Sequence, residues 1–244
     1  MARKSPIEWT EMTWNPVTGC TKVSPGCKHC YAEVMARRLV AMGSMRYLDG
    51  FQVKLQYDLV ELPMRWKSPR TVFVNSMSDL FHPDVPVDFI RSVFDTMREC
   101  PRHQFQVLTK RAERLVELAP HLEWSPNIWM GVSIENQKYA YRSRLLASVP
   151  AAIRFLSIEP MLGPIHDLPL ERIHWAIVGG ESGHKARVME RSWVQEVFRQ
   201  CRTAEVPFFF KQWGGVQKHR TGRKLFGRTY DEMPFLHDRH TAPA

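Results

Sequence analysis

The sequence has no long apolar run and no apolar stretch at its beginning. Nothing approaches the roughly eighteen apolar residues that a membrane-spanning helix needs, so no membrane partner is expected. The opening residues MARKSPIEWT lack the apolar core of a secretory signal peptide. We therefore expect a cytoplasmic protein, whose thiols stay reduced and are available to bind metal rather than to form disulfides.

Histidine-based metal motifs are missing too. The ten histidines show no HxH or HExxH spacing, which argues against a metal-dependent hydrolase. Internal repeats and low-complexity segments are also absent, which excludes a repeat architecture. The composition, 44% hydrophobic and 11% aromatic over 244 residues, instead predicts a folded domain with a sizeable core.

Acidic residues are outnumbered, 25 Asp and Glu against 34 Lys and Arg, giving a formal net charge of +9. This balance favours a polyanionic partner, although bulk charge alone argues only for nonspecific attraction. Residues 211–228 carry six basic side chains and no acidic one, with Trp213 and Phe226 interspersed. Such a segment could bind a nucleic acid by gripping the phosphate backbone and stacking on bases. A solvated basic tail is the alternative.

Three of the five cysteines form the most informative motif. Cys20, Cys27 and Cys30 stand in CTKVSPGCKHCYAE as C-x6-C-x2-C, and a helical pattern follows. The intervening Ser-Pro-Gly, residues 24–26, suits a tight loop. Three thiolates can bind three irons of a cubane cluster and leave the fourth iron open to a ligand.

Zinc and a disulfide are the alternatives for this loop. Structural zinc needs a fourth ligand, and no second C-x2-C pair is present. A disulfide suits neither an odd number of cysteines nor a reducing compartment. Side chains that could complete a zinc site lack a recognisable spacing: His29, His82, Cys100 and Cys201. The last two stand in helical contexts and are expected to be buried core cysteines.

The cysteine loop resembles that of the radical S-adenosylmethionine (SAM) enzymes. Their usual motif is C-x3-C-x2-C with an aromatic residue before the third cysteine, whereas here the first gap is six residues and His29 takes the aromatic position. Other segments resemble a phage-associated, radical-SAM-like family of uncharacterised proteins, distantly similar to spore photoproduct lyase. They span most of residues 7–215: WNPVTGC, VNSMSDLFH, LTKR, GVSIEN, LSIEPMLG, VGGESG and FFFKQWG.

Strand-like and helix-like segments alternate along the chain. Apolar, β-branched runs predict strands near 12–17 and at 71–76, 104–110, 127–135, 153–160, 174–182 and 207–213. Helical patterns predict helices at 87–100, 111–119, 139–149 and 192–206, the last with Ser192 as its N-cap. Repeated β–α units imply parallel strands joined by right-handed crossovers.

We therefore predict an α/β fold, a partial or complete TIM-like barrel. The resemblance agrees, because radical SAM enzymes generally use a partial barrel; an open doubly wound parallel sheet is the alternative. The predicted domain covers residues 1–215, with an irregular insert at 41–70. Residues 216–244 are predicted to be a basic, flexible C-terminal tail.

Nearly every predicted strand ends in polar residues. Parallel α/β folds place their chemistry at the carboxyl ends of the strands, so we expect these side chains to converge near the cysteine loop. Glu135, Glu159 and Glu181 follow apolar strands at equivalent points. A buried carboxylate needs a partner, and Lys110, Lys211 or a ligand ammonium would serve.

The resemblance implies two cofactors, a 4Fe–4S cluster on the three cysteines and SAM chelated to the open iron. It places the SAM amine near the end of the second strand, where Ser76, Ser78 and Asp79 stand. The other implied contacts are Lys110 with the carboxylate, Ser133 or Glu135 with the ribose, Ser157 or Glu159 with the methionyl group, and His29 near the adenine.

The resemblance thus implies a radical SAM enzyme that cleaves SAM and abstracts hydrogen from a substrate, with a nucleic acid base as the candidate. It also implies an electron donor such as flavodoxin or ferredoxin, and the need for a second protein stays open. The alternative is a nonenzymatic nucleic-acid-binding protein with a structural zinc or iron–sulfur site. That alternative predicts a metal held entirely by protein ligands and no SAM binding.

Overall fold

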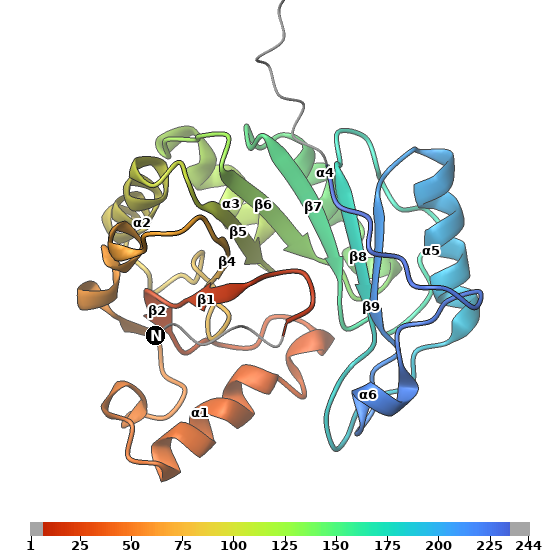
Figure 1. Cartoon of the computed structure of the whole chain (residues 1–244), viewed down its shortest axis with the longest axis horizontal. Coiled ribbons are helices and arrows are strands. Elements are labelled where there is room, and N and C mark those ends of the chain that lie inside the picture. The colour runs from red at the N-terminus through yellow and green to blue at the C-terminus, as the bar shows by residue number, and fades with distance from the viewer. Residues whose placement is uncertain (1–6, 235–244) are drawn as a thin grey trace, which may run out of the picture.

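Seven parallel strands form one curled sheet within residues 7–234, the part of the chain that the computed structural model describes (Figure 1). Their order along the sheet is their order along the chain, and β1 and β9 form its two edges. The strands are β1 (Met12–Trp14), β4 (Thr71–Val74), β5 (Gln104–Thr109), β6 (Ile128–Ser133), β7 (Ile153–Ile158), β8 (Trp175–Gly179) and β9 (Phe208–Gln212). A short antiparallel pair joins β2 (Val17–Thr18) to β3 (Lys54–Leu55).

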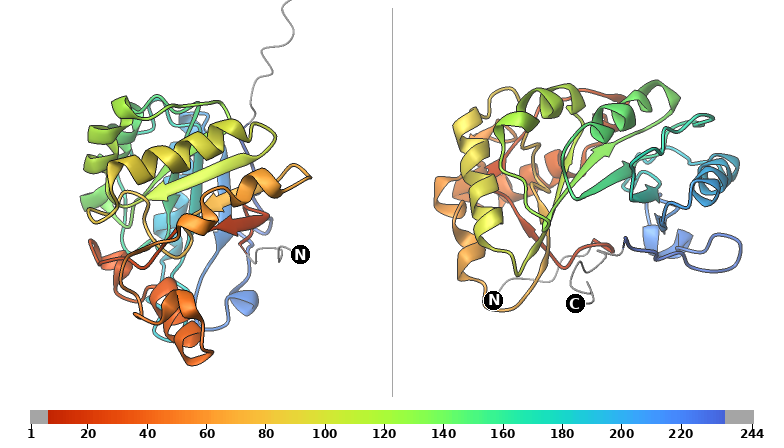
Figure 2. Two further views of the ribbon diagram at one scale, coloured as in Figure 1. Left: turned by 90° about the vertical axis from the view of Figure 1, so that its left-hand side faces the viewer. Right: turned by 90° about the horizontal axis from the view of Figure 1, so that it is seen from above.

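Helices cover the outer, convex face of the sheet (Figure 2). These are α2 (Val87–Glu99), α3 (Ala112–Leu118), α4 (Tyr141–Ala147) and α5 (Arg191–Thr203). By contrast, α1 (Tyr31–Ala41) and α6 (Lys218–Thr221) lie below the sheet in Figure 1, at the carboxyl ends of the strands. Single 3-10 turns are Pro25–Cys27, Met45–Tyr47, Tyr57–Leu59, Leu62–Arg65, Ala119–His121 and Gln137–Tyr139.

The strands are apolar almost throughout because both faces of the sheet are covered. On the convex side, α2 buries the stripe that its sequence periodicity predicts, from Phe89 and Ile90 to Met97. Alternate residues of β6, Ile128, Met130 and Val132, belong to the same outer core. This packing fixes the sheet, and with it the positions of the strand ends.

The concave face is filled by aromatic side chains in its amino-terminal half. Trp175 is fully buried there, and its ring lies 5.8–6.4 Å from four neighbouring aromatic rings. Its indole N–H donates to the carbonyl of Glu232 at 2.7 Å, so the chain near the C-terminus closes over this cluster. The aromatic members are Trp9, Phe73, Trp129, Phe155, Trp175 and Phe209.

The predicted partial barrel is confirmed, and the doubly wound alternative is wrong. A doubly wound sheet reverses its strand order at a switch point, whereas here the order rises steadily from β1 to β9. The predicted helix at 192–206 begins instead at Arg191, with Glu190 as its N-cap. Ser192 as N-cap is therefore wrong, because it already lies inside the first helical turn.

Residues 216–234 pack against the β9 edge. Leu225 and Tyr230 are buried, and Asp231 forms an antiparallel bridge with Phe209. The predicted domain boundary at residue 215 stays a prediction, and residues 235–244 of the predicted tail lie outside the described residues. Within the described part of the chain, no helix combines the length and apolarity needed to cross a membrane.

Candidate functional site

The three motif cysteines lie on one loop between β2 and α1. Cys20 follows Gly19, whose φ of 81° and close approach to the Gln52 carbonyl leave no room for a side chain. Cys27 ends the first 3-10 turn, and Cys30 is the N-cap residue of α1. All three are free and half-buried. The loop thus presents three thiols at the carboxyl edge of the sheet.

A buried carboxylate after β6 holds the middle of this loop. Glu135 is fully buried and accepts a hydrogen bond from the hydroxyl of Ser24. A Cβ placed on Gly26 would lie 2.6 Å from Glu135 Oε1, so the glycine permits this close packing. On its other side, Glu135 Oε2 accepts from Arg142 Nη1 at 3.2 Å. The carboxylate is therefore paired, as its burial requires.

A second carboxylate, after β8, holds the end of the loop. Glu181 Oε2 lies 3.1 Å from His29 Nδ1 and accepts from both the backbone N–H and Nε of Arg187, at 2.9 and 2.8 Å. Arg187 Nη2 also donates to the carbonyl of Pro25 at 2.9 Å. Burial alone would raise the pKa of Glu181, but the hydrogen bonds from Arg187 and His29 outweigh it and lower that pKa to about 2.

Asp79 ties the end of β4 to the end of β5, near Cys20. Its Oδ1 accepts from the hydroxyl of Thr109 at 2.7 Å, and its Oδ2 accepts from the N–H of Lys110 at 3.1 Å. Burial, and then the Asp79 charge, raise the pKa of Cys20 to about 11, against the opposing effect of Arg111. Cys20 is thus a neutral thiol at neutral pH, and binding a metal would require the loss of its proton.

The start of the loop is held separately. Arg111 Nη2 donates to the hydroxyl and the carbonyl of Thr21, at 3.0 and 3.2 Å. The same hydroxyl lies 2.7 Å from Nε2 of the buried His82, whose Nδ1 accepts from the N–H of Asp84. Burial lowers the pKa of His82, so it is a neutral ring within this network.

The two predicted serines after β4 make protein contacts. Ser78 Oγ donates to the carbonyl of Val17 at 2.7 Å, and Ser76 Oγ donates to Oδ1 of Asn15 at 3.1 Å. The backbone carbonyl of Ser76 accepts from the hydroxyl of Tyr31. These contacts join the end of β4 to the β1–β2 turn and to the start of α1.

Other predicted residues leave polar groups at the strand ends. Glu159 pairs with Lys211 at 2.7 Å, which confirms Lys211 as a carboxylate partner. The hydroxyl of Ser133 is buried without a hydrogen-bond partner. Among the described residues, the hydroxyl of Ser157 and the ammonium of Lys110 have no hydrogen-bond partner either. A bound polar ligand would satisfy these groups.

Three cysteine thiols on one loop are the donor type that an iron–sulfur cluster takes. Within residues 7–234, no three Cys, His, Asp or Glu side chains gather closely enough to hold one metal ion. In a cubane, each cysteine binds a different iron, so its thiols lie farther apart than they do around one ion. Three thiols would bind three irons of such a cluster.

Sequence reasoning missed the arginines that pair with two of the three strand-end glutamates. It offered lysines, whereas Glu135 pairs with Arg142 and Glu181 with Arg187. A usable signal existed, because each arginine follows its glutamate by six or seven residues, on the segment that leads away from the strand. The expected buried state of Cys100 and Cys201 is confirmed.

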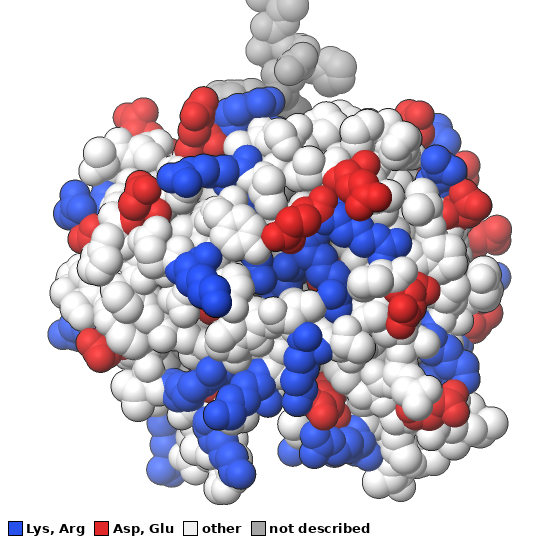
Figure 3. Space-filling view, turned by 180° about the vertical axis from the view of Figure 1, so that it is seen from behind, with Lys and Arg blue, Asp and Glu red and all other residues white. Residues whose placement is uncertain are grey.

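The basic segment 211–228 is partly committed to internal contacts. Lys211 pairs with Glu159, Arg223 pairs with Asp231, and Arg228 lies over the ring of Tyr230. Figure 3 shows acidic and basic residues mixed over the upper part of the helix-covered face, whereas Lys and Arg predominate near the lower edge. That edge corresponds to the carboxyl ends of the strands in Figure 1.

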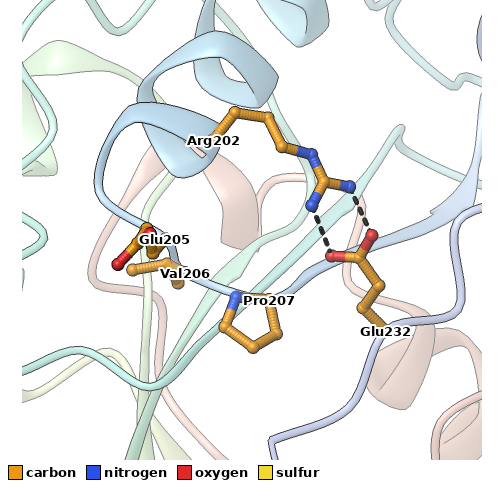
Figure 4. Close-up of a pocket in the computed structure, with 5 residues that line it drawn as sticks. All are labelled: Arg202, Glu205, Val206, Pro207 and Glu232. Atoms are coloured by element: carbon orange, nitrogen blue, oxygen red, sulfur yellow. Dashed lines mark hydrogen bonds and ion pairs between the residues drawn. The ribbon is translucent and has the colours of Figure 1, made fainter.

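A shallow pocket lies at the opposite end of the sheet. It is formed where α5 leads into β9, and the guanidinium of Arg202 pairs across it with the carboxylate of Glu232 (Figure 4). Because Pro207 directly precedes β9, this pocket is at the amino end of the strand, away from the cysteine loop. Its lining residues are Arg202, Glu205, Val206, Pro207 and Glu232.

The fold is similar to that of a cysteine-to-serine mutant of spore photoproduct lyase. The TM-score is 0.51 at 14% sequence identity, over 76% of this chain and 60% of that chain. At this identity the likeness concerns the curled parallel sheet alone, and the chain matches about 60% of the length of that protein. No curated protein matches the sequence. The family described as "Protein of unknown function (DUF5131)" matches residues 4–234, so the chain belongs to the DUF5131 family.

Proposed function

We propose that this protein is a radical SAM enzyme. The observation that carries the proposal is the cysteine loop: three free thiols lie at the carboxyl edge of a parallel half-barrel. The fold likeness to spore photoproduct lyase supports it. When bound, a 4Fe–4S cluster supplies the electron that cleaves SAM to methionine and a 5′-deoxyadenosyl radical, which takes hydrogen from a substrate.

In this proposal, Cys20, Cys27 and Cys30 bind the cluster. Glu135 and Glu181 do not react; they hold the loop at Ser24, Gly26, His29 and Pro25, so that the thiols keep their positions. Orientation of this kind is the protein's usual contribution to cofactor chemistry.

SAM is proposed to bind beside the loop, over the strand ends. The groups best suited to contact it are the unpartnered hydroxyl of Ser133, the hydroxyl of Ser157 and the ammonium of Lys110. A cationic lysine suits the methionyl carboxylate, and hydroxyls suit the ribose. The SAM contacts predicted for the other strand-end and loop residues stay predictions. In the structure, the side chains of these residues have protein partners: His29, Ser76, Ser78, Asp79, Glu135 and Glu159.

A nucleic acid is the proposed substrate class. The net charge of +9 supports it, and so does Lys224 of segment 211–228, which has no acidic partner among the described residues. Basic residues of this kind attract the phosphate backbone of a nucleic acid, and the attraction should weaken steeply with salt.

The decisive test is electron paramagnetic resonance of the protein purified without oxygen and reconstituted with iron and sulfide. A reduced cubane signal that changes when SAM is added would support an open iron. Stoichiometric zinc with no cluster would overturn the proposal and favour a nonenzymatic nucleic-acid-binding protein. A cluster signal indifferent to SAM would also overturn it, because the cluster would then be structural.

A further inference from the structure

A tight turn near the end of the described chain holds a phenylalanine in a backbone conformation that suits it poorly. Leu225 and Arg228 exchange two backbone hydrogen bonds, at 2.9 and 3.2 Å. Between them, Phe226 and Gly227 have φ values of 51° and 80°. Positive φ at both central residues is the geometry of a two-residue turn, which favours Asn-Gly. A bulky side chain there is an outlier, and such outliers concentrate at functional positions.

The ring of Phe226 is held in place but is not covered. It packs against Phe198 of α5, with ring centroids 5.4 Å apart, and is still 50% exposed. Leu225, directly before it, is fully buried, and the indole N–H of Trp213 donates to the carbonyl of Lys224 at 3.0 Å. These contacts anchor the turn to the rest of the fold. Because the ring is already fixed, a flat partner can stack on its exposed side with little further loss of conformational freedom.

Positive charge is in excess around this ring. Lys224 and Arg228 are exposed and have no acidic partner among the described residues. Arg228 lies over the ring of Tyr230 at 4.6 Å, and a stacked guanidinium keeps its N–H groups in its own plane, where an anion can accept them. The acidic residues of α5 and of segment 223–232 already have arginine partners: Glu196 with Arg199, Asp231 with Arg223, and Glu232 with Arg202.

The turn lies outside the concave face that holds the strand-end groups. Phe198 belongs to α5, which covers the convex face of the sheet (Figure 2). A fixed ring beside unpaired cations is the arrangement that binds a single-stranded nucleic acid, because the ring stacks on a base while the cations contact phosphates. In a duplex the faces of the bases are already stacked on one another, so the ring favours an unpaired strand.

Resting on the nucleic-acid substrate of the proposed function, we propose that Lys224, Phe226 and Arg228 form an accessory binding site for a single-stranded nucleic acid. An unpaired base stacks on the exposed side of Phe226, and Lys224 and Arg228 bind the phosphates next to it. The site is separate from the reaction site at the carboxyl ends of the strands, so it holds the strand and takes no part in the chemistry.

The test measures how the full-length protein binds a short fluorescent single strand and the matching duplex, by fluorescence anisotropy at several salt concentrations. Phe226→Asn removes the ring and keeps the turn, because asparagine tolerates a left-handed backbone. Phe226→Tyr keeps the ring, and Lys224→Gln removes one charge. Tyr57→Asn and Lys67→Gln are the matched controls, at an exposed ring and an exposed lysine elsewhere on the surface.

We expect Phe226→Asn to weaken single-strand binding about tenfold or more and to remove the preference for the single strand over the duplex. Phe226→Tyr should bind within about twofold of the wild type. Lys224→Gln should weaken binding of both forms and should lower the slope of log K against log salt by about one. Both control variants should bind within about twofold of the wild type.

Several outcomes would overturn the accessory site. They are equal single-strand binding by Phe226→Asn and the wild type, an equal loss in Tyr57→Asn, and a wild-type preference for the duplex. Loss of self-association in Phe226→Asn, seen by analytical ultracentrifugation, would make a second copy the occupant and would also overturn the site. A wild type that binds neither form would overturn the nucleic-acid substrate class as well. The cluster and its response to SAM are read separately, so none of these results counts against the radical SAM assignment.

Discussion

The two halves of the concave face differ in what they hold together. In the amino-terminal half, six aromatic side chains pack on one another around Trp175. At the carboxyl ends, polar groups reach across to a loop that belongs to no strand, as Glu135 and Glu181 do. The amino-terminal half therefore stabilises the sheet, whereas the carboxyl-end half positions the thiols. Substitutions in each half should therefore affect different measurements.

The largest expected effect is on metal binding. The triple variant Cys20→Ala, Cys27→Ala and Cys30→Ala should lose all bound iron and sulfide, because these three thiols are the proposed cluster ligands. Its free energy of unfolding, measured on the apoproteins in urea, should stay within about 1 kcal/mol of the wild type, since half-buried free thiols contribute little packing. Cys100→Ala is the control and should keep its iron. Retained iron, or an unfolded triple variant, would contradict the division of roles between the two halves of the concave face.

The next effect is on stability. Trp175→Ala should reduce the free energy of unfolding by about 3–5 kcal/mol, because it leaves a cavity among buried rings and an unpaired Glu232 carbonyl. Urea denaturation measures this loss. Trp175→Phe should cost less, since it keeps most of the packing. Iron content of the folded fraction should be unchanged; a Trp175→Ala protein as stable as the wild type, or one that selectively loses iron, would show that the halves are not independent.

A pH-dependent effect is expected at Glu181. Its pKa falls from an ordinary value of 4.5 to about 2 in the folded protein, so the carboxylate stabilises the fold above about pH 4.5 and loses that contribution as the pH falls toward 2. Glu181→Gln should therefore cost about 2–3 kcal/mol at pH 7. The difference from the wild type should shrink between pH 5 and pH 3 in urea titrations. Glu123→Gln, at an exposed carboxylate, is the control; a difference independent of pH would refute the assignment.

The smallest expected effect tests the contact beneath the loop. Gly26→Ala puts a methyl group 2.6 Å from Glu135 Oε1, so the loop must shift. We expect about 1 kcal/mol of destabilisation together with a reduced fraction of cluster bound on reconstitution. Gly163→Ala, whose Cβ meets one neighbouring atom at 3.2 Å, is the matched control and should keep full cluster content. Normal loading of Gly26→Ala would mean that Glu135 does not position the thiols.

Much of the fold could be predicted from the sequence because its signals are local. The β5 segment 104–110 and the α2 segment 87–100 match their observed bounds within one residue. Runs of apolar residues and helical periodicity reflect the burial of each element, so they can be recognised without knowing which other elements pack against it. The N-cap assignment of Ser192 was wrong because a serine near the start of a helix can also lie inside the first turn, as Ser192 does here.

The site was predictable in its location but not in its contacts. The convergence of strand ends follows from parallel topology, and Lys211 was among the carboxylate partners proposed from the sequence. The pairings of Glu135 with Arg142 and of Ser24 with Glu135 were not foreseen, since the latter pair lies 111 residues apart in the chain. Contacts at such separation depend on how the whole sheet curls.

The sequence by itself determined the alternation of strands and helices, the three-thiol motif and the excess of positive charge, because each is written in neighbouring residues. Only the tertiary structure decided that Glu135 and Glu181 form hydrogen bonds with the cysteine loop and that apolar side chains of α1 are exposed beside it. The physical reason is that pairing and exposure depend on which surfaces meet. In this chain, the curl of the sheet brings the ends of β6 and β8 against the loop and leaves the outer face of α1 uncovered.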